Sequence, residues 1–541
     1  MVELVTPGDV VDLGRGAVDR ASGKKRAKSH RPVRDNVESF AIAILFAVLL
    51  KPFLLEAYQI PTPSMQPTMM GCPPAGVHDR LIVDKLRYAL FEPKRWDIVV
   101  FRYPIRQVQS YVKRIVGVGG DRFIIGGGNL VPVDADGKEQ APIRKPANIQ
   151  KGQWKELFPA RMYLDDKSRL LDGYFSAQPQ WTEEDGVLST RAEPGRSVTV
   201  SYTDQGHGGL ADRVYDGYPT SVAKAMRADA RTMMASFEAV ADARLAFTLQ
   251  ASGTVENLAV ELDTRPPGKS NKALRFALEV GGGKARLVVR EGGKEVKASE
   301  PVDFALGNGS RVGIRFTHVD GVLLAERDGT QIAELACHPY LVLDELPVGA
   351  ATLAVNVRGG DQIRVSDLVV ERDIQYKLGS LSKGVPIEVP EGHFFMMGDN
   401  PEQSADAREW RAITVGVEPD GTLVDPTTHP EARKMVGNLR PKGLSDEVDA
   451  DENPVLVPER DAVVFTDDLG EVHVLHGQPN LSPSDKAYGV VSGVWFAGDK
   501  GPWQPRSHRV QFVPREHVLG RPLLNFWPIW PIGPMRFGFI R

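Results

Sequence analysis

The chain has 541 residues, 42% of them hydrophobic and 25% charged, which is typical of a globular protein and excludes a wholly disordered or coiled-coil chain. A net charge of −4 gives no global basic field for nucleic acid. Two cysteines exclude a disulfide scaffold and any all-cysteine metal site. The mean hydropathy of −0.24 excludes a polytopic membrane protein but allows one span.

An apolar segment near the start of the chain predicts one membrane anchor over residues 36–58. Residues 40–50 are all apolar, and only Glu38 and Lys51 are charged between positions 37 and 55. This length is close to the ~20 residues that cross a bilayer as a helix. Residues 1–35 hold eight Lys and Arg, which keep such a tail in the cytoplasm. A buried core helix is the alternative, and a cleaved signal peptide lacks an A-x-A site here.

A proline-rich loop follows the apolar segment at residues 59–69. Pro61, Pro63 and Pro67 exclude a helix and favour a rigid, extended loop. Ser64 lies within this loop, which makes it a candidate nucleophile, although most segments of this composition are linkers. Met65 beside it is predicted to contact substrate or lipid, or to pack in the core.

Three β-rich runs come next, at residues 79–85, 96–102 and 110–121, and predict strands around one core. In the third run, alternation puts Lys113 on one face with two large hydrophobic side chains, Tyr111 and Ile115, and points Arg114 away. A lysine on an apolar face is a candidate functional residue.

Residues 136–380 predict an inserted antiparallel β-sandwich of jelly-roll type. Evenly spaced, strand-like runs occur at 245–251, 258–263, 273–280, 285–290, 311–317, 321–326, 351–358 and 363–370. Turn signals separate them, among them Asp320-Gly321 and Asp328-Gly329. Before these strands, apolar residues at three- and four-residue steps from Val222 to Val240 predict a helix.

A second insertion is expected at residues 412–508, with strands at 462–466 and 471–475. The tail at 526–531 carries two tryptophans beside prolines. Such a segment suits a membrane interface, and core packing explains it equally well. Cys72 and Cys337 could pair in an oxidising compartment or remain thiols.

Five blocks, in family order, resemble the type I signal peptidases, membrane-bound serine proteases of the Ser–Lys class. The nucleophile box corresponds to residues 60–68, the second block to 97–101, the lysine box to 111–121, the late box to 398–408 and the C-terminal block to 513–521. These blocks cover less than half of the chain, and the remainder is insertion relative to the family pattern.

The resemblance implies that Ser64 is the nucleophile and that a neutral Lys113 is its general base. Free lysine has a pKa of about 10.4, so half-neutrality near pH 7 requires a pKa about three units lower, on the order of 4 kcal/mol. Burial can supply that shift if no carboxylate lies beside the amine. The resemblance assigns Ser404 to orient the lysine, whereas a plain turn residue is the alternative.

The resemblance also implies an oxyanion hole formed by the backbone N–H of Ser64 and the hydroxyl of Thr62. Pro63 stands where many relatives have glycine, so a loop geometry that departs from the family pattern is expected. No metal or cofactor is implied, and no G-x-S-x-G, H-E-x-x-H or P-loop motif is present.

The late box supplies three residues that the resemblance implies are structural: Asp399, Asp406 and Arg408. An Asp–Arg pair among them would hold the Ser404 loop against the catalytic core. Loss of one should loosen the site without removing the chemistry.

The predicted fold is mainly β, a signal-peptidase-type catalytic domain interrupted twice behind one transmembrane helix. The expected organisation is a basic tail (1–35), an anchor (36–58), a catalytic part (59–135), the sandwich (136–380), a second catalytic part (381–411), the second insertion (412–508) and a C-terminal catalytic part (509–541).

The expected function is removal of signal peptides from exported preproteins at the outer face of the bacterial cytoplasmic membrane, with small residues selected near the cut. The expected partners are these preproteins and the lipid bilayer, not nucleic acid. The sandwich resembles concanavalin-like and laminin-G-type modules, and it serves as a spacer, a protein contact or a ligand-binding module. A Ser–Lys self-cleaving regulator and an inactive, membrane-tethered binding protein are the alternatives.

Overall fold

The computed structural model describes the larger part of the chain. The described residues are 36–42, 45, 54–72, 76–158, 173–177, 181–191, 195–203, 209–213, 216–218, 236–264, 273–338, 351–437, 456–457, 462–477, 479–480, 495–496, 502–503, 505, 507–527 and 538–540.

The chain divides into two compact units, Met1–Leu54 and Leu55–Arg541. In the first unit, residues 36–42 are helical. Within the residues that the structure describes, no helix has the length and apolar character needed to cross a bilayer. Residues 43, 44 and 46–53 of the predicted anchor, and the whole basic tail, lie outside the described residues. The last part of the predicted anchor is a strand, β1, which begins at Leu55.

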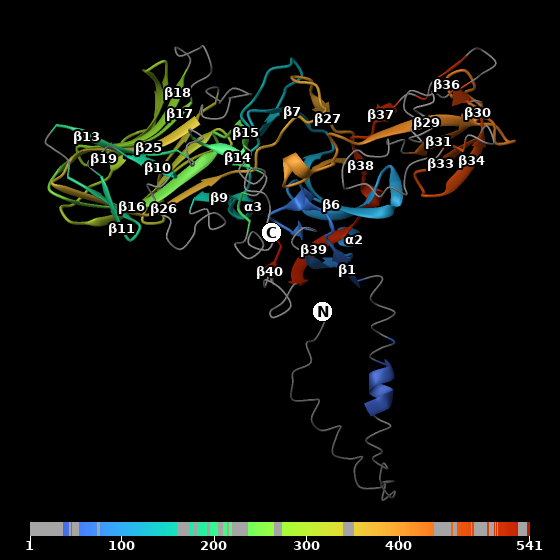
Figure 1. Cartoon of the computed structure of the whole chain (residues 1–541), viewed down its shortest axis with the longest axis horizontal. Helices are drawn as coiled ribbons and strands as arrows, with labels where there is room; N and C mark the ends of the chain where they lie inside the picture. The colour runs from blue at the N-terminus through green and yellow to red at the C-terminus, as the bar shows by residue number, and fades with distance from the viewer. Residues whose placement is uncertain are drawn as a thin grey trace, which may run out of the picture. The chain divides into compact units, whose positions relative to one another are not determined.

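The second unit is built around one mixed-length antiparallel sheet, called the main sheet (Figure 1). Its strands, in spatial order, are β1 (Leu55–Gln59), β4 (Arg80–Asp84), β39 (Val518–Trp527), β5 (Ile98–Tyr103), β6 (Arg106–Val118), β28 (His393–Met397) and β38 (Val513–Pro514), with β40 (Gly538–Phe539) paired to β39.

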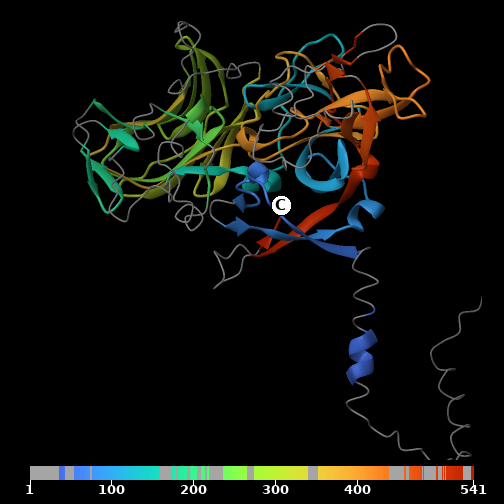
Figure 2. The same cartoon turned by 45° about the vertical axis from the view of Figure 1, so that its right-hand side comes forward.

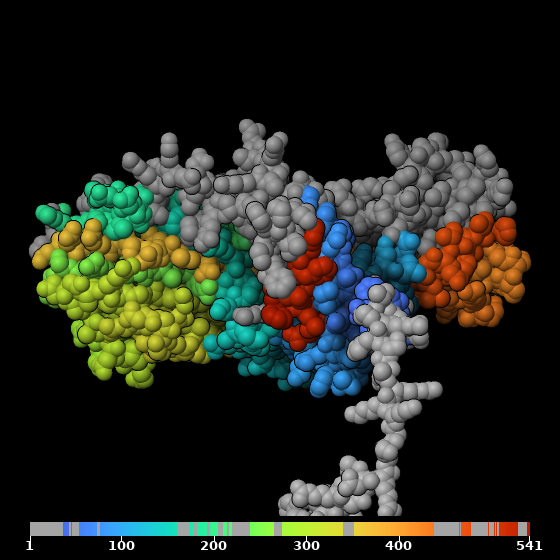
Figure 3. All heavy atoms as spheres, turned by 90° about the horizontal axis from the view of Figure 1, so that it is seen from below, coloured from blue at the N-terminus to red at the C-terminus, as the bar shows by residue number. Residues whose placement is uncertain are grey.

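The C-terminal strand β39 lies inside the main sheet and joins its two halves, because it pairs with β4 on one side and β5 on the other. Figure 2 shows this strand in red crossing the blue strands from the start of the unit. In the space-filling view of Figure 3, red C-terminal residues lie beside blue residues on the same face. Segments from the two ends of the unit therefore share one sheet.

The main sheet is buried on both faces around β5 and the end of β6. Residues 98–101 are all buried, as are residues 113–117. The apolar side chains of these strands pack with aromatic residues such as Phe395 and Trp410. A side chain at either face of β6 therefore lies in a protein interior and not in solvent.

The inserted sandwich consists of two eight-stranded antiparallel sheets. One contains β10 (Phe175–Ala177), β13 (Ser197–Tyr202), β25 (Ala351–Gly359), β17 (Val255–Thr264), β18 (Leu274–Gly281), β19 (Lys284–Glu291), β20 (Lys294–Ala298) and β21 (Val302–Asp303). The other contains β11 (Thr182–Glu184), β12 (Val187–Thr190), β26 (Gln362–Arg372), β16 (Ala243–Ser252), β22 (Arg311–Val319), β23 (Val322–Arg327), β24 (Thr330–Ala336) and β9 (Lys155–Phe158).

All eight strands predicted from the sequence in this region are confirmed. Their side chains alternate between buried and partly exposed, most clearly in β16 and β25, and the buried set forms one apolar core. The predicted turns are also present. Asp320 and Asp328 have φ of 46° and 51° and open the tight connections after β22 and β23.

The helix predicted between Val222 and Val240 is wrong at its C-terminal end. Residues Ser236–Ala239 form a strand, β15, which pairs with β14 (Ala211–Arg213). Positions 219–235 lie outside the described residues. The three- and four-residue spacing was outweighed here by backbone pairing with a neighbouring strand.

The second insertion forms a four-stranded sheet and a three-stranded sheet, which share an apolar cluster. The four-stranded sheet contains β29 (Arg411–Val417), β30 (Leu423–Val424), β31 (Arg433–Gly437) and β37 (Ser507–Arg509). The three-stranded sheet contains β32 (Leu456–Val457), β33 (Ala462–Thr466) and β34 (Val472–His476). The two predicted strands correspond to β33 and β34. The turn between them contacts the main sheet, because the Gln107 backbone N–H donates to the Asp468 carbonyl at 2.6 Å.

The remaining elements are short. They are the strands β2 (Gly71–Cys72), β3 (Val77–His78), β7 (Arg122–Gly126), β8 (Asn129–Pro132), β27 (Ile387–Glu388), β35 (Pro479–Asn480) and β36 (Trp495–Phe496), the helices α2 (Arg87–Leu90) and α3 (Ala147–Gln153), and the 3-10 turns η1 (Pro63–Met65), η4 (Pro401–Gln403) and η7 (Arg515–His517). Cys72 and Cys337 are both buried and are not joined by a disulfide.

Candidate active site

Ser64 lies in the one-turn 3-10 segment η1, within the proline-rich loop. Its residue surface is 3% exposed, and its carbonyl accepts a hydrogen bond from the Asn400 backbone N–H at 3.1 Å. The Thr62 hydroxyl lies 3.3 Å from the Ser64 hydroxyl. The hydroxyl pair that the resemblance assigns to the nucleophile and the oxyanion hole is therefore brought together.

Buried contacts on the inner side of this loop fix its conformation. Met65 is 1% exposed and lies in an apolar cluster with Ile60 and Leu81, which favours the core-packing role. The Gln66 side-chain amide donates to the Gly71 carbonyl at 2.8 Å. A Cβ at Gly71 would approach the loop backbone to 2.3 Å, so only glycine permits this contact.

Lys113 lies near the end of β6 and is 3% exposed. Its backbone is in register with Val99, and its amine lies 5.9 Å from the centre of the Tyr111 ring. Ile115 on the same face is fully buried. Lys113 is therefore buried beside Tyr111 and Ile115, on the face that the alternation predicted.

Gly398 brings the late box against the nucleophile loop. A Cβ at this position would lie 2.3 Å from both the Ser404 hydroxyl and the Ser64 carbonyl. Ser404 is 8% exposed, and its hydroxyl makes no hydrogen bond with the part of the chain that the structure describes. Ser404 therefore lies close to the nucleophile segment.

Arg114 and Asp399 form a fully buried ion pair that was not predicted. The Arg114 guanidinium donates to both carboxylate oxygens of Asp399, at 2.7 and 2.6 Å, and also to the Trp96 carbonyl at 2.8 Å. Asp399 further accepts a hydrogen bond from the Thr68 hydroxyl at 2.6 Å. Burial alone would raise the Asp399 pKa, but Arg114 holds it below its usual value.

This pair joins three segments of the site: the lysine strand, the late box and the nucleophile loop. The alternation predicts that Arg114 points away from the apolar face of Lys113, and it does so, but both faces of β6 are buried and the side chain enters a second interior layer. The apolar run that follows Arg114 was the available signal. A strand that is apolar at successive positions is buried on both faces, so its charged residue needs a buried partner.

Asp406 and Arg408 form a second buried pair. The guanidinium donates to the two carboxylate oxygens at 2.7 and 2.8 Å, and Arg408 also donates to the carbonyls of Pro401 and Lys377, each at 3.0 Å. The Asp406 carboxylate accepts the Gly398 N–H at 3.1 Å. These hydrogen bonds connect residues before Ser404 with residues after it, and so fix the conformation of the segment that carries Ser404.

Asp406 also feels the positive charge of Lys113. Burial would raise the Asp406 pKa, but Arg408 lowers it most strongly and Lys113 contributes in the same direction. The Lys113 charge therefore contributes to the electrostatics of Asp406, although Arg408 is its direct partner. The charge of Asp406 is already neutralised by the two-point contact with Arg408, which limits how far it favours the lysine cation.

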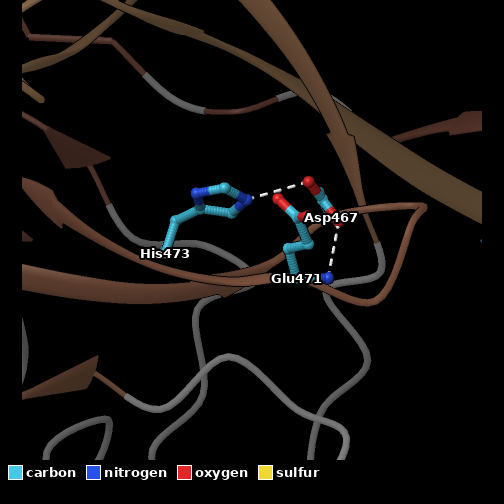
Figure 4. Close-up of side chains that lie close together, drawn as sticks. All are labelled: Asp467, Glu471 and His473. Atoms are coloured by element: carbon cyan, nitrogen blue, oxygen red, sulfur yellow. Dashed lines mark hydrogen bonds and ion pairs between the residues drawn. The ribbon is translucent and has the colours of Figure 1, made fainter.

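Two groups of side chains in the described part of the chain have the donors and spacing of a metal site. One is Asp467 and Glu471 in the β33–β34 turn with His473 on β34, where the His473 ring nitrogen points at the Asp467 carboxylate at 2.8 Å and Glu471 lies alongside (Figure 4). The other is a buried set of three aspartates at the junction with the sandwich. In the latter, the Lys145 ammonium already contacts two of the three carboxylates.

Comparison with known families places these segments in context. Residues 33–166 and 345–427 match the family described as signal peptidase, peptidase S26. The matched segments contain the nucleophile loop, the lysine strand and the late box, and most of the sandwich lies between them.

Curated relatives give the same result. The chain is 28% identical to signal peptidase I of Leptolyngbya laminosa over 159 residues, which covers 27% of this chain and 73% of the relative. It is 29% identical to a probable signal peptidase I-2 of Synechocystis, over 29% of this chain and 72% of the relative. Identity reaches 36% with signal peptidase I of Aquifex aeolicus, over only 16% of this chain and 32% of the relative.

Solved structures that resemble the chain include a carbohydrate-binding module from Bacillus subtilis, with a TM-score of 0.22 and 7% identity over 37% of this chain and 95% of the module. A β-glucanase of Bacillus licheniformis gives a TM-score of 0.24 and 7% identity, over 41% of this chain and 97% of the glucanase. Scores this low carry no information on what the sandwich binds.

The matched segments and the hydroxyl-bearing loop define a peptidase of the serine hydrolase class. More narrowly, the two matched segments are those of the signal peptidase family, peptidase S26, and the chain is similar there to type I signal peptidases.

Proposed function

We propose that the chain removes N-terminal signal peptides from exported preproteins, with Ser64 as nucleophile and Lys113 as general base. The observation that carries this proposal is the meeting of three segments at one buried place. The loop of Ser64, the strand of Lys113 and the late box with Gly398 are in mutual contact there.

In the proposed reaction, Lys113 takes the proton of the Ser64 hydroxyl as the serine oxygen bonds to the scissile carbonyl carbon. The Ser64 N–H and the Thr62 hydroxyl stabilise the oxyanion. Lys113 then gives its proton to the leaving amine as the C–N bond breaks. A water, deprotonated by the same lysine, hydrolyses the acyl-enzyme and restores Ser64.

Ser404, Asp399, Asp406 and Arg408 act as positioning residues in this proposal. The two buried ion pairs fix the late box, and Ser404 on that box orients Lys113. Loss of an ion pair should misplace the amine without removing either reacting group, so a partial loss of rate is expected.

We further propose that the segment at 36–58 anchors the chain in the bacterial cytoplasmic membrane, with its basic tail in the cytoplasm and the second unit outside. The apolar run and the eight preceding basic residues support this. The test is carbonate extraction of membranes together with protease accessibility. Release of the chain by carbonate, or protection of the second unit in spheroplasts, would contradict it.

One assay tests the chemistry. The full chain in detergent micelles is incubated with a preprotein whose signal peptide ends in A-x-A, beside the variants Ser64→Ala and Lys113→Met. We expect both variants to lose at least about 10³-fold in kcat/KM, as removal of a catalytic group does. Lys94→Met is the matched control, since Lys94 is exposed.

Two outcomes would overturn the assignment. The first is cleavage by Ser64→Ala at a rate near that of the wild type, or no cleavage by the wild type. The second concerns pH: kcat/KM should rise with pH as the lysine base loses its proton, and a flat profile from about pH 5 to 9 would remove Lys113 from that role.

A further inference from the structure

A cavity of about 500 Å³ lies at the junction between the sandwich and the main-sheet part of the second unit. Its wall is formed by the β7–β8 turn at 126–128, the segments 238–242 and 373–379 that flank the sandwich, and the late box from Pro401 to Glu409. We call it the junction cavity. This volume is within the range of sites that bind small molecules.

The wall of the junction cavity is acidic. It contains two cationic side chains, and both are already engaged: Arg408 by Asp406, and Lys377 by Asp212 at 2.7 Å and by Glu402. The carboxylates on the wall are Glu238, Asp242, Asp373, Glu402 and Glu409.

Two of these carboxylates, Glu238 and Glu409, are only partly compensated by the cations of the wall, Lys377 and Arg408 respectively. Glu409 accepts a hydrogen bond from the Ser380 backbone N–H at 2.8 Å, and Glu238 accepts one from the Gln375 amide at 3.0 Å. The cation nearest to Glu238 in the described part of the chain is Lys377, at 3.9 Å. These two groups are therefore available to a cationic ligand.

Two buried hydroxyls on the wall have no hydrogen-bond partner among the described residues. Tyr376 is 2% exposed and Ser404 is 8% exposed, and each oxygen is unsatisfied. An unmade hydrogen bond of a buried polar group costs about 1–3 kcal/mol. A ligand that donates N–H groups into the cavity would satisfy such oxygens.

The same wall already holds one alkylammonium group. The Lys145 amine contacts Asp320 at 2.5 Å and Asp373 at 2.6 Å, and it lies 5.8 and 6.0 Å from the ring centres of Trp96 and Tyr376. Asp373 and Tyr376 are shared with the cavity. Carboxylates together with aromatic rings are a known environment for amines.

We propose that the junction cavity binds a small molecule that carries two or more amino groups. Its ammonium groups pair with Glu238 and Glu409, and its N–H groups donate to the hydroxyls of Tyr376 and Ser404. The carboxylates are spread over separate segments of a cavity far larger than an ion, which favours an extended amine over a metal ion.

Occupancy of this cavity changes the rate of the peptidase. Ser404 and Arg408 belong both to the cavity wall and to the late box that contacts the nucleophile loop. A ligand seated there contacts the segment that orients Lys113. The effect of occupancy on the rate rests on the proposed function, whereas binding of the amine does not.

The experiment measures binding of spermidine to the full chain in detergent by titration calorimetry at constant ionic strength. The test variant is Glu238→Gln/Glu409→Gln, which removes two charges without changing side-chain size. The matched control is Glu291→Gln/Glu300→Gln, two exposed carboxylates of the sandwich. We expect at least about a tenfold weaker Kd in the test variant, or 1.4 kcal/mol, and no change in the control.

Three results would overturn the proposal: no saturable binding of spermidine, equal weakening in both double variants, or equal competition by magnesium at the same ionic strength. Ser64→Ala separates the two proposals, because it should bind spermidine with the Kd of the wild type. If that variant binds spermidine but the wild type cuts no preprotein, the peptidase proposal fails and the cavity proposal stands. If spermidine binds without altering kcat/KM, only the coupling to Ser404 is refuted.

Discussion

The sandwich and the main sheet are both antiparallel, but different forces stabilise their interiors. The sandwich core is apolar, and strands such as β16 and β25 bury every second side chain. The main sheet buries charged groups beside its apolar ones. Arg114, Asp399, Asp406 and Arg408 are all at most 2% exposed.

This difference indicates which part of the chain tolerates amino-acid substitution. Apolar packing is non-directional, so a sandwich strand needs only hydrophobic residues of roughly the right size. A buried ion pair needs both partners in one geometry, and the loss of either leaves an uncompensated charge. The part of the molecule nearest the proposed chemistry is therefore also the part least tolerant of substitution.

The largest effect on stability is expected from Arg114→Met. Asp399 would remain buried without its partner, so the free energy of unfolding should fall by about 3–5 kcal/mol. Chemical denaturation at pH 7 measures this value. A fall below about 1 kcal/mol would show that the pair does not stabilise the main sheet.

The pH dependence of this variant sharpens the comparison. Arg114 holds the Asp399 pKa below its usual value. The stabilisation is therefore complete above the unfolded carboxyl pKa of about 3.9 and is lost as pH falls through the lower folded pKa. Arg114→Met should lack this acid-dependent loss.

A smaller effect, centred near 3 kcal/mol, is expected from Leu258→Ala in the sandwich. Leu258 is fully buried, and such truncations cost about 2–5 kcal/mol through lost burial and the cavity left behind. The loss should be equal at pH 4 and pH 8, unlike that of Arg114→Met. Val296→Ala, at a 36% exposed position, is the control and should change stability by less than about 0.5 kcal/mol.

Lys155→Met tests one exception to the comparison, a buried cation on a sandwich strand. Burial, reinforced by Arg372, lowers the pKa of Lys155 to about 7. The folded chain therefore binds fewer protons than the unfolded chain between about pH 7 and the free lysine pKa near 10.4, so this residue makes stability rise with pH there.

The substitution by methionine should stabilise the protein by about 1–2 kcal/mol at pH 6, where the charge is buried, and by much less at pH 10. Thermal unfolding at the two pH values measures the difference. Equal destabilisation at both would mean that the lysine charge is paired in solution.

The smallest effect is expected from Arg144→Met. Arg144 and Glu334 form an ion pair at 2.6 Å, but their side chains are 45% and 42% exposed. Such pairs contribute about 0–1 kcal/mol and are screened by salt. A loss larger than about 1.5 kcal/mol in a denaturation series would break the distinction between exposed and buried pairs.

The sequence was sufficient to predict the strands of the sandwich and of the early main sheet. Alternation and turn residues such as Asp320 are local signals, and the structure has strands at each of those places. The helix predicted up to Val240 could not be tested against local pattern alone, because pairing of β15 with β14, a strand outside the periodic segment, decided its conformation.

The candidate site was predictable only in part. Family-like blocks pointed to Ser64 and Lys113, and Lys113 lies on the apolar face that the alternation indicated. The partner of Arg114 could not be predicted from local pattern, since Asp399 is 285 residues away. The junction cavity has no local signal at all, because its wall comes from four separate segments.

The contact at Gly398 also has a consequence for the order of events during synthesis. Ser64 leaves the ribosome early, whereas Gly398 and Asp399 are made only after the sandwich, and the strand β39 only after both insertions. Contacts across such separations form late, because the intervening chain must first be closed into a loop. A half-made chain therefore carries a serine without its site, and the ability to cut arises only when translation is nearly finished.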